Sequence, residues 1–264
     1  MDFGIQGKIA LVTAGSKGLG RGCAEALSAE GARVAICART TAEVERTAQE
    51  IAAKTGHEVL AFTADMSKPG EIDRLLASVR EAMGDPDILV CNAGGPPPGD
   101  FASTGLDAFG PALELSLMSS VRLTYGCVSA MKEKGWGRIV MITSVSVRQP
   151  IPYLILSNTA RAGLAGFMKT VAREIADSGV TVNAALPGSH DTDRIRQTAV
   201  KRAEAAGRTL EEEMTESLKT INPMKRMGTP DEFGALVTFL CSKQAAFITG
   251  ENVLADGGAY GGIL

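Results

Sequence analysis

The sequence has no long apolar run, and it has no excess of basic residues. Nowhere do roughly 18 apolar residues follow one another, which excludes a membrane-spanning helix of ordinary length. The net charge of the 264 residues is −3, whereas broad nucleic-acid binding needs a basic surface. The chain starts with Met1-Asp2-Phe3-Gly4, which carries an acid and no basic segment, so we expect no signal peptide.

Residues that bind metals or form disulfides are few and scattered. The chain has 5 cysteines, none in a Cys-x-x-Cys pair, and we expect reduced, mostly buried thiols in a cytoplasmic protein. Its two histidines, His57 and His190, lie far apart in the sequence. Because no Cys, His or carboxylate cluster has ligand spacing, we expect no metal site.

Short apolar runs alternate with segments of helical spacing along the whole chain. Continuous apolar runs are typical of strands buried on both faces, which occur in parallel sheets between two layers of helices. The predicted strands are 8–13, 33–38, 58–63, 87–92, 138–143, 180–185 and 252–255. The predicted helices are 20–31, 41–55, 69–83, 106–134 (with a break near Pro111), 156–177 and 230–242. The pattern therefore predicts a doubly wound α/β fold with seven parallel strands.

We find no linker or low-complexity tract that divides the chain, so residues 1–264 are predicted to form a single domain. One charged, helix-prone insertion, at about 189–227, follows the sixth predicted strand. Ligands of open α/β sheets bind at the carboxyl ends of the strands, so an insertion there is placed to act as a lid. A solvated helical surface or a subunit contact is the alternative.

A glycine-rich loop joins the first predicted strand to the first predicted helix. Such a loop lets the backbone approach a pyrophosphate closely, and the helix N-terminus offers free N–H groups and a positive dipole end. The loop consists of Thr13, Ala14, Gly15, Ser16, Lys17, Gly18, Leu19 and Gly20. We therefore predict that it binds the diphosphate of a dinucleotide.

This loop resembles the Thr-Gly-x-x-x-Gly-x-Gly loop of the short-chain dehydrogenase/reductase family, with Ala14 in place of the first glycine. The resemblance continues at Asp65-Met66 (adenine), Asn92-Ala93-Gly94 (cofactor border), Thr143-Ser144 (catalytic serine), Pro187-Gly188 (nicotinamide) and Asp256-Gly257-Gly258. It implies a Rossmann-type fold, a frame nearest to the 3-oxoacyl-carrier-protein reductases, and a homo-oligomer, either a dimer or a tetramer.

The second predicted strand ends in Cys37-Ala38-Arg39-Thr40, without the carboxylate that usually binds the ribose 2′-hydroxyl of NAD. Arg39 is suited to a forked contact with a 2′-phosphate, and Lys17 adds a second positive charge. NADP(H) is therefore favoured over NAD(H). Each of these residues alone has the alternative of being a solvated surface charge.

The catalytic positions that the resemblance implies are only partly occupied. The family uses a tyrosine as proton donor, a lysine four residues later, a serine and an asparagine. Ser144 fits the serine, but Ser157, Arg161 and Ser116 stand where the tyrosine, lysine and asparagine are expected. A serine hydroxyl has no useful acidity near neutral pH, and arginine does not replace lysine closely.

Two residues offer alternatives at this site. Tyr153 lies four residues before Ser157 and would reach the pocket as proton donor if the helix began early, although Pro150 and Pro152 favour an extended segment. Arg161 is expected to contact the cofactor ribose, as the family lysine does. A carboxylate or phosphate of a substrate is its second possible partner.

Three functions remain open at this point. The first is an NADP(H)-dependent oxidoreductase that reduces a ketone or oxidises a secondary alcohol, with a small-molecule carbonyl or alcohol as its partner and no nucleic acid or membrane. The second is a catalytically silent or sensing protein that binds a dinucleotide. The third is a non-redox enzyme, such as a lyase or isomerase, on the same frame, because fold does not determine function.

Overall fold

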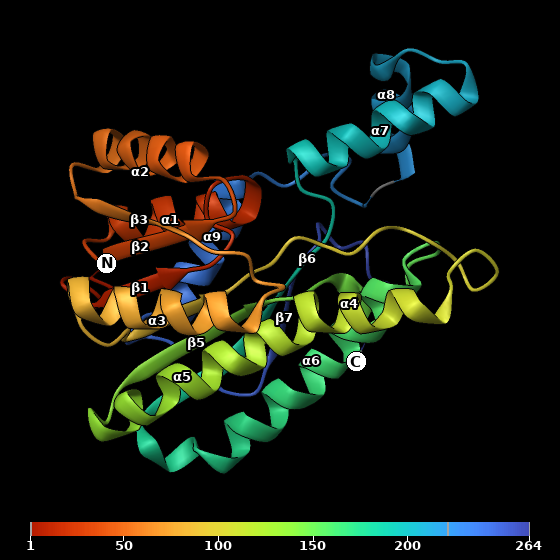
Figure 1. Cartoon of the computed structure of the whole chain (residues 1–264). Helices are drawn as coiled ribbons and strands as arrows, with labels where there is room; N and C mark the ends of the chain where they lie inside the picture. Colours follow the sequence, from red (N-terminus) through yellow and green to blue (C-terminus); the bar gives the residue numbers. More distant parts are fainter. Residues whose placement is uncertain (1, 221, 264) are drawn as a thin grey trace.

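Seven short strands alternate with helices along the chain (Figure 1). The computed structural model describes residues 2–220 and 222–263. Residues 1 and 264 of the predicted domain and residue 221 of the predicted lid lie outside the described residues. The strands are β1 (Ile9–Val12), β2 (Arg33–Ala38), β3 (Val59–Thr63), β4 (Ile88–Cys91), β5 (Gly137–Ile142), β6 (Val180–Pro187) and β7 (Asn252–Ala255).

The strands form one sheet in the order β3-β2-β1-β4-β5-β6-β7, and every neighbouring pair is parallel. All residues of β1, β4 and β5 are buried, as their apolar sequences predict, and the burial includes Arg138 of β5. The prediction of a doubly wound, seven-stranded parallel sheet is confirmed. The strand order reverses between β1 and β4, where open α/β sheets bind their ligands.

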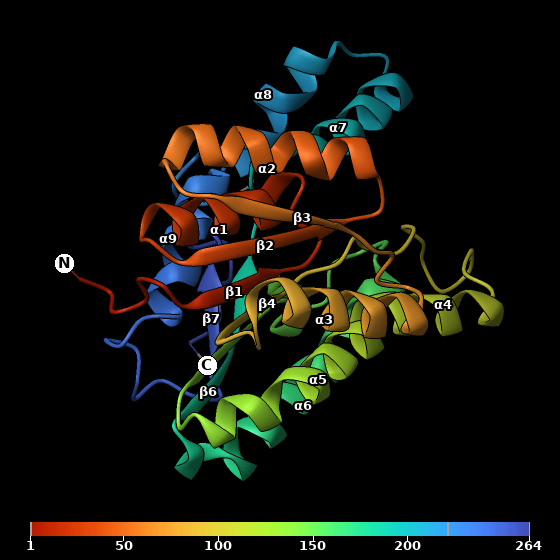
Figure 2. The ribbon, with the colours of Figure 1, turned by 60° about the vertical axis from the view of Figure 1, so that its left-hand side comes forward.

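Helices cover both faces of the sheet (Figures 1 and 2). Along β1 the side chains alternate, because Leu11 packs in one apolar core while Ala10 and Val12 pack in the other. One layer contains α1 (Gly18–Ala29), α2 (Thr41–Thr55) and α9 (Pro230–Leu240), and the other contains α3 (Pro69–Met83), α5 (Ser119–Glu133) and α6 (Ile155–Glu174). The two layers cover the faces of the sheet and leave the edge formed by the carboxyl ends of the strands uncovered.

Two glycines let α1 cross α9 at close range. A Cβ atom on Gly22 would lie 2.3 Å from the carbonyl oxygen of Pro230, and one on Gly234 would lie 2.3 Å from the carbonyl oxygen of Gly22. No larger residue fits at either position without moving a helix. This contact fixes α1, and with it the glycine loop that precedes the helix.

The segment predicted as one long helix at 106–134 is helical throughout but changes its type. A 3-10 turn at Leu106–Ala108 leads into α4 (Phe109–Leu113), a π-helical turn at Glu114–Met118 follows, and α5 continues from there. The predicted break near Pro111 is wrong. Pro111 stands in the first turn of α4, where a missing N–H group costs no helical hydrogen bond.

The insertion at 189–227 contains α7 (Asp193–Ala206) and α8 (Leu210–Thr220), which project from the carboxyl edge of the sheet and belong to neither layer (Figure 2). Its two stems are joined by main-chain hydrogen bonds. The amide of Asp191 donates to the carbonyl of Gly228 over 2.8 Å, and the amide of Gly228 donates to the carbonyl of Ser189 over 3.0 Å.

Candidate functional site

The glycine loop connects β1 to α1, whose N-terminus has no side-chain cap. Lys17, the N-cap residue, makes no side-chain hydrogen bond to the first turn, which also contains no acidic residue. The N–H groups of this turn and the positive end of the helix dipole are therefore unopposed. Ala14 adopts a φ of +46° where the resemblance implies glycine, which places a methyl group in the left-handed region.

The loop forms a narrow cradle that has room for backbone only. A Cβ atom on Gly20 would lie 2.3 Å from the carbonyl oxygen of Ala14 and 2.8 Å from Nδ2 of Asn92. On Gly15 it would lie 2.9 Å from the side chain of Ile36. The exposed N–H groups and the absence of side-chain bulk fit the diphosphate of a dinucleotide.

The end of β4 is bound directly to the end of β1 at the point where the strand order reverses. The Thr13 hydroxyl donates to the carbonyl of Asn92 over 2.7 Å and accepts from the Asn92 amide over 2.9 Å. Nδ2 of Asn92 donates to the carbonyl of Ala14 over 3.3 Å. Asn92 thus fixes the glycine loop and leads into Ala93 and Gly94, as the resemblance implies.

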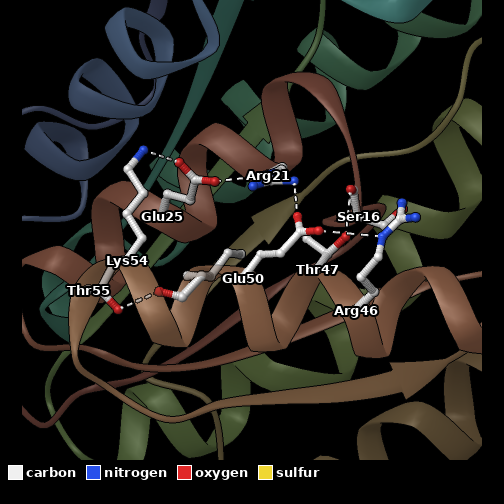
Figure 3. A network of polar contacts seen from close by, with 9 residues as sticks. Ser16, Arg21, Glu25, Arg46, Thr47, Glu50, Lys54 and Thr55 are labelled. Carbon is white, nitrogen blue, oxygen red and sulfur yellow. Dashed lines mark hydrogen bonds and ion pairs between the residues drawn. The ribbon is translucent and has the colours of Figure 1, made fainter.

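A network of polar contacts joins α1 to α2 behind the loop (Figure 3). The Thr47 hydroxyl donates to the carbonyl of Ser16 over 3.1 Å. Glu25 accepts from Arg21 over 2.7 Å and from Lys54 over 2.6 Å. Burial raises the pKa of Glu25, but the two cations outweigh burial and leave the pKa below its ordinary value. The network holds α2 beside the loop.

The two cations expected at the adenosine end have acidic neighbours. Lys17 forms an ion pair at 2.8 Å with Glu43, which stands in the first turn of α2. This pair was not predicted from the sequence. Arg39 is exposed and forms no ion pair within the described chain. Asp65 accepts two hydrogen bonds from Ser67, at 2.9 and 2.8 Å.

The carboxylate of Asp65 stays ionised in the turn after β3, where the resemblance places the adenine. Burial raises the pKa of Asp65, but the hydrogen bonds from Ser67 and the nearby Arg39 together lower it below its ordinary value. The next residue, Met66, is buried under this turn. The electrostatic effect of Arg39 on Asp65 places both residues at the same corner of the site.

Arg161 ties α6 to the carboxyl end of β5. Its Nη1 atom donates to the carbonyl oxygens of Ile142 and Thr143, at 2.9 Å each, and its Nε atom donates to Oγ of Ser157 over 3.1 Å. The guanidinium therefore brings Ser157 to the strand end that leads into Ser144. Its contact with a cofactor ribose stays a prediction.

The two predicted catalytic serines share one feature. Oγ of Ser144 accepts from the amide of Ser146 over 3.1 Å, while Oγ of Ser157 accepts from Arg161. Each oxygen already accepts one hydrogen bond, so each hydroxyl proton is available for donation to a substrate. Ser144 is half-buried and Ser157 is 8% exposed.

Ser116, at the position expected to hold asparagine, lies in the π-helical turn and is 4% exposed. Within the described residues its hydroxyl has no hydrogen-bond partner, and the same holds for the hydroxyls of Thr143 and Ser146. Buried hydroxyls without partners are costly, and π-helical turns are frequent at functional sites. These groups are suited to a bound water or ligand.

Tyr153 lies outside the helix that carries Ser157. α6 begins at Ile155, and Tyr153 stands in the preceding turn with a φ of +61°. Its carbonyl accepts from the amide of Gly99, and its side chain is 68% exposed. The early helix start that would bring Tyr153 into the pocket does not occur, so its role as proton donor stays a prediction without geometric support.

The end of β6 and the root of the insertion complete the edge of the site. A Cβ atom on Gly188, next to Pro187, would lie 2.6 Å from Cα of Asp256, so only glycine fits there. Thr192, the N-cap of α7, lies over the glycine loop, because a Cβ on Gly18 would be 3.3 Å from its Cγ2. The sequence analysis did not single out Thr192.

Several features of other site classes are missing from residues 2–220 and 222–263. No group of three or more His, Cys, Asp or Glu side chains is placed to hold a metal ion. None of the helices in this part of the chain has the length and apolar character needed to cross a membrane. All five cysteines are buried and unpaired.

Comparisons with known proteins agree over nearly the whole chain. A family model described as enoyl-(acyl carrier protein) reductase matches residues 13–260. The 3-oxoacyl-(acyl-carrier-protein) reductase of Escherichia coli is 35% identical over 98% of this chain and 99% of its own length. The D-beta-hydroxybutyrate dehydrogenase of Rhizobium meliloti is 33% identical over 95% of this chain and 98% of its own length.

The solved structures agree with the sequence comparisons. L-sorbose reductase from Gluconobacter frateurii, solved with NADPH and L-sorbose, has a TM-score of 0.95 and 32% identity, with 100% of both chains covered. A 3-oxoacyl (acyl-carrier-protein) reductase from Agrobacterium tumefaciens with NADP bound has a TM-score of 0.88 and 30% identity, with 97% of this chain and 96% of that chain covered.

Proposed function

Because this chain belongs to the short-chain dehydrogenase/reductase family of oxidoreductases, we propose that it is an NADP(H)-dependent reductase that converts a ketone into a secondary alcohol. The observation that carries this proposal is the open N-terminus of α1 under a cradle that admits only backbone. An anionic diphosphate is the ligand that such a helix end favours.

We assign the parts of the cofactor to groups around this cradle. NADPH, when bound, supplies the hydride that reduces the carbonyl carbon. Arg39 and Lys17 hold the 2′-phosphate, and Asp65 with Met66 borders the adenine. The diphosphate is bound by the main chain of Ser16, Gly18, Leu19 and Gly20. Gly15 gives it room, while its own N–H donates to the carbonyl of Cys37 over 2.9 Å. The nicotinamide side is bordered by Asn92, Ala93, Gly94, Pro187 and Gly188.

We assign the oxygen and proton chemistry to the two serines. Ser144 donates its proton as a hydrogen bond to the substrate oxygen. Ser157 transfers its proton to the alkoxide that forms there and takes a proton back from solvent water. Arg161 supports Ser157 as a positioning residue, because its cation lies 3.1 Å from the oxygen that becomes negative. A substrate alkoxide is about as basic as hydroxide, so a serine is acidic enough to protonate it.

The same pair is a poor base. Oxidation of an alcohol requires a group that accepts the hydroxyl proton, and a serine hydroxyl is almost never ionised at pH 7. The replacement of tyrosine by Ser157 therefore lowers the rate in both directions. At pH 7 the net direction is reduction, because reduction of a ketone by NADPH consumes a proton. Tyr153, exposed in its turn, supports neither direction in this proposal.

A second candidate function has one observation in its favour. Three hydrogen bonds already hold the guanidinium of Arg161 to Ser157 and to two main-chain carbonyls, as they would if its role were structural. A chain in which Arg161 only stabilises the fold would bind NADP(H) without turnover and act as a sensing protein. A non-redox enzyme on this frame has no specific observation that supports it.

We extend the proposal to the insertion, the assembly and the compartment. The insertion at 189–227 acts as a lid, which the position of Thr192 over the glycine loop supports. A homo-oligomer, dimer or tetramer, is supported by Tyr125 of α5, which is 73% exposed and stacks on Phe167 of α6. A cytoplasmic location is supported by the five unpaired cysteines.

The test follows NADPH absorbance with a panel of ketones, aldehydes and 3-oxoacyl thioesters, and measures NADPH affinity by calorimetry. The proposal expects turnover in reduction and little or no oxidation of the product alcohol at pH 7. Tight NADPH binding without turnover on any substrate supports the second candidate. No binding of either pyridine dinucleotide contradicts both.

Variants on one helix test the role of Ser157. We expect Ser157→Ala to lower kcat about 10²-fold or more while the Kd for NADPH stays the same, because a positioned proton donor contributes ~10²–10⁴-fold. The matched control is Thr159→Ala, which removes an exposed hydroxyl from the same helix and should leave kcat unchanged. Equal rates for Ser157→Ala and the control exclude Ser157 as the donor.

A further inference from the structure

A cavity of about 400 Å³ lies beside the candidate catalytic residues. Its walls come from the turn after β3, from the loop after β4, from α4 with the π-helical turn, and from the start of α6. We call it the proline pocket, because Pro96, Pro97 and Pro98 form one side of it. Its volume lies within the range of pockets that bind small molecules.

The proline pocket shares two helical segments with the candidate catalytic site. Leu115 and Leu156 line it, and each immediately precedes a polar residue of that site, Ser116 and Ser157. The two helical segments that carry these pairs pack against each other. A ligand that reaches Ser157 with its carbonyl oxygen therefore has this cavity available for one of its two substituents.

The lining of the proline pocket is uncharged, and it offers few free donors. No lining residue is a Lys, Arg, Asp, Glu or His. Of the three hydroxyl residues in its wall, Ser67 donates to Asp65 over 2.8 Å and Ser103 donates to Asp100 over 2.6 Å. An ionised or polyhydroxylated substituent placed there loses water contacts without gaining partners, which disfavours it.

The pocket is also stiff. Proline fixes φ, so the loop that contains Pro96, Pro97 and Pro98 loses little conformational freedom when a ligand binds. Leu156 is 4% exposed and is held in the packed start of α6. A preformed apolar cavity of this kind gains affinity from each apolar group that fills it.

We propose that the proline pocket binds an apolar alkyl or aryl substituent of the substrate ketone, so that this chain selects apolar ketones over sugars and acidic ketones. The inference rests on the proposed reductase function and specifies its substrate class. It also separates this chain from the similar L-sorbose reductase, whose substrate carries hydroxyl groups along its length.

The first experiment measures KM and kcat with NADPH for a series of 2-alkanones of increasing chain length and for L-sorbose. We expect KM to fall about fourfold for each added methylene until the pocket is full, with kcat nearly constant. L-sorbose should be a poor substrate. A KM that does not change with chain length, or a preference for L-sorbose, overturns the inference even if reduction itself is observed.

Two variants in the same loop region locate the effect. Ala108→Leu places a larger side chain in the wall of the pocket. It should abolish the fall in KM with chain length, so that the KM for long alkanones is about tenfold or more above the wild-type value. Ala102→Leu adds the same bulk at an exposed position outside the pocket and should keep the wild-type trend. The same trend in both variants contradicts a site in the proline pocket.

Binding without turnover separates this inference from the proposed function. Saturation-transfer NMR with 2-octanone and the unmodified protein reports ligand contact whether or not the ketone is reduced. If no ketone is reduced but 2-octanone binds to the wild type and not to Ala108→Leu, the reductase proposal is wrong. The assignment of the proline pocket as a site for an apolar group is then still supported. If 2-octanone contacts both proteins equally, or neither, the pocket assignment is wrong.

Discussion

Truncation of Arg161 should destabilise the protein strongly, although the side chain is charged and only half-buried. Arg161→Ala removes the three hydrogen bonds to Ile142, Thr143 and Ser157. A hydrogen bond from a charged donor contributes about 1.5–3 kcal/mol. With the lower value for each bond, the loss in the free energy of unfolding is about 4.5 kcal/mol, or a fall in Tm of about 9–18 °C for a chain of this size.

Thermal unfolding followed by circular dichroism measures this effect. Arg161→Lys should be intermediate, since an ammonium reaches fewer of the three acceptors than the planar guanidinium. The matched control is Arg148→Ala, an exposed arginine just past the end of β5, which should change the free energy of unfolding by less than about 0.5 kcal/mol. A Tm for Arg161→Ala within 2 °C of the control, on the scale of about 2–4 °C per kcal/mol, would refute this reasoning.

Three further perturbations test neighbouring parts of the account. Ala14→Gly relieves a φ of +46° and should raise the free energy of unfolding by up to about 1 kcal/mol in denaturant titrations; a loss of stability contradicts the strain. Glu43→Gln releases Lys17 and should tighten NADPH binding severalfold in calorimetry without changing NADH binding, whereas an equal effect on both excludes Lys17 as a 2′-phosphate ligand. Burial lowers the pKa of His190, so the folded protein binds fewer protons than the unfolded chain, and stability should fall as the pH drops below about 6.5. Denaturation at several pH values should show this fall in the wild type and a weaker one in His190→Gln.

Much of the fold follows from local signals that the sequence carries openly. The predicted helices 41–55 and 69–83 have the observed bounds, because Gly56 takes a left-handed φ of +76° after one helix and Pro69 begins the other. The π-helical turn at Glu114–Met118 has no such signal. It packs against α5 and α6, and periodicity along a single segment does not report such contacts.

The sequence indicated which residues belong to the candidate site, but it did not indicate which contacts their side chains make. Ser144 and Ser157 were assigned as candidates from the resemblance to the family, whose motif positions they occupy. The direction of the Arg161 side chain and the pairing of Lys17 with Glu43 depend on rotamers and on a neighbouring helix, which a sequence pattern does not determine. The proline pocket, which is built from segments far apart in sequence, was not predicted.

The most direct test of the central claim is calorimetric titration of the protein with NADPH and with NADH. The account predicts that NADPH binds and that NADH binds more weakly. Arg39→Ala should reduce this difference by weakening NADPH alone, because a phosphate contact from arginine is lost. Titrations without heat for both dinucleotides, supported by unchanged thermal stability in their presence, would contradict the account.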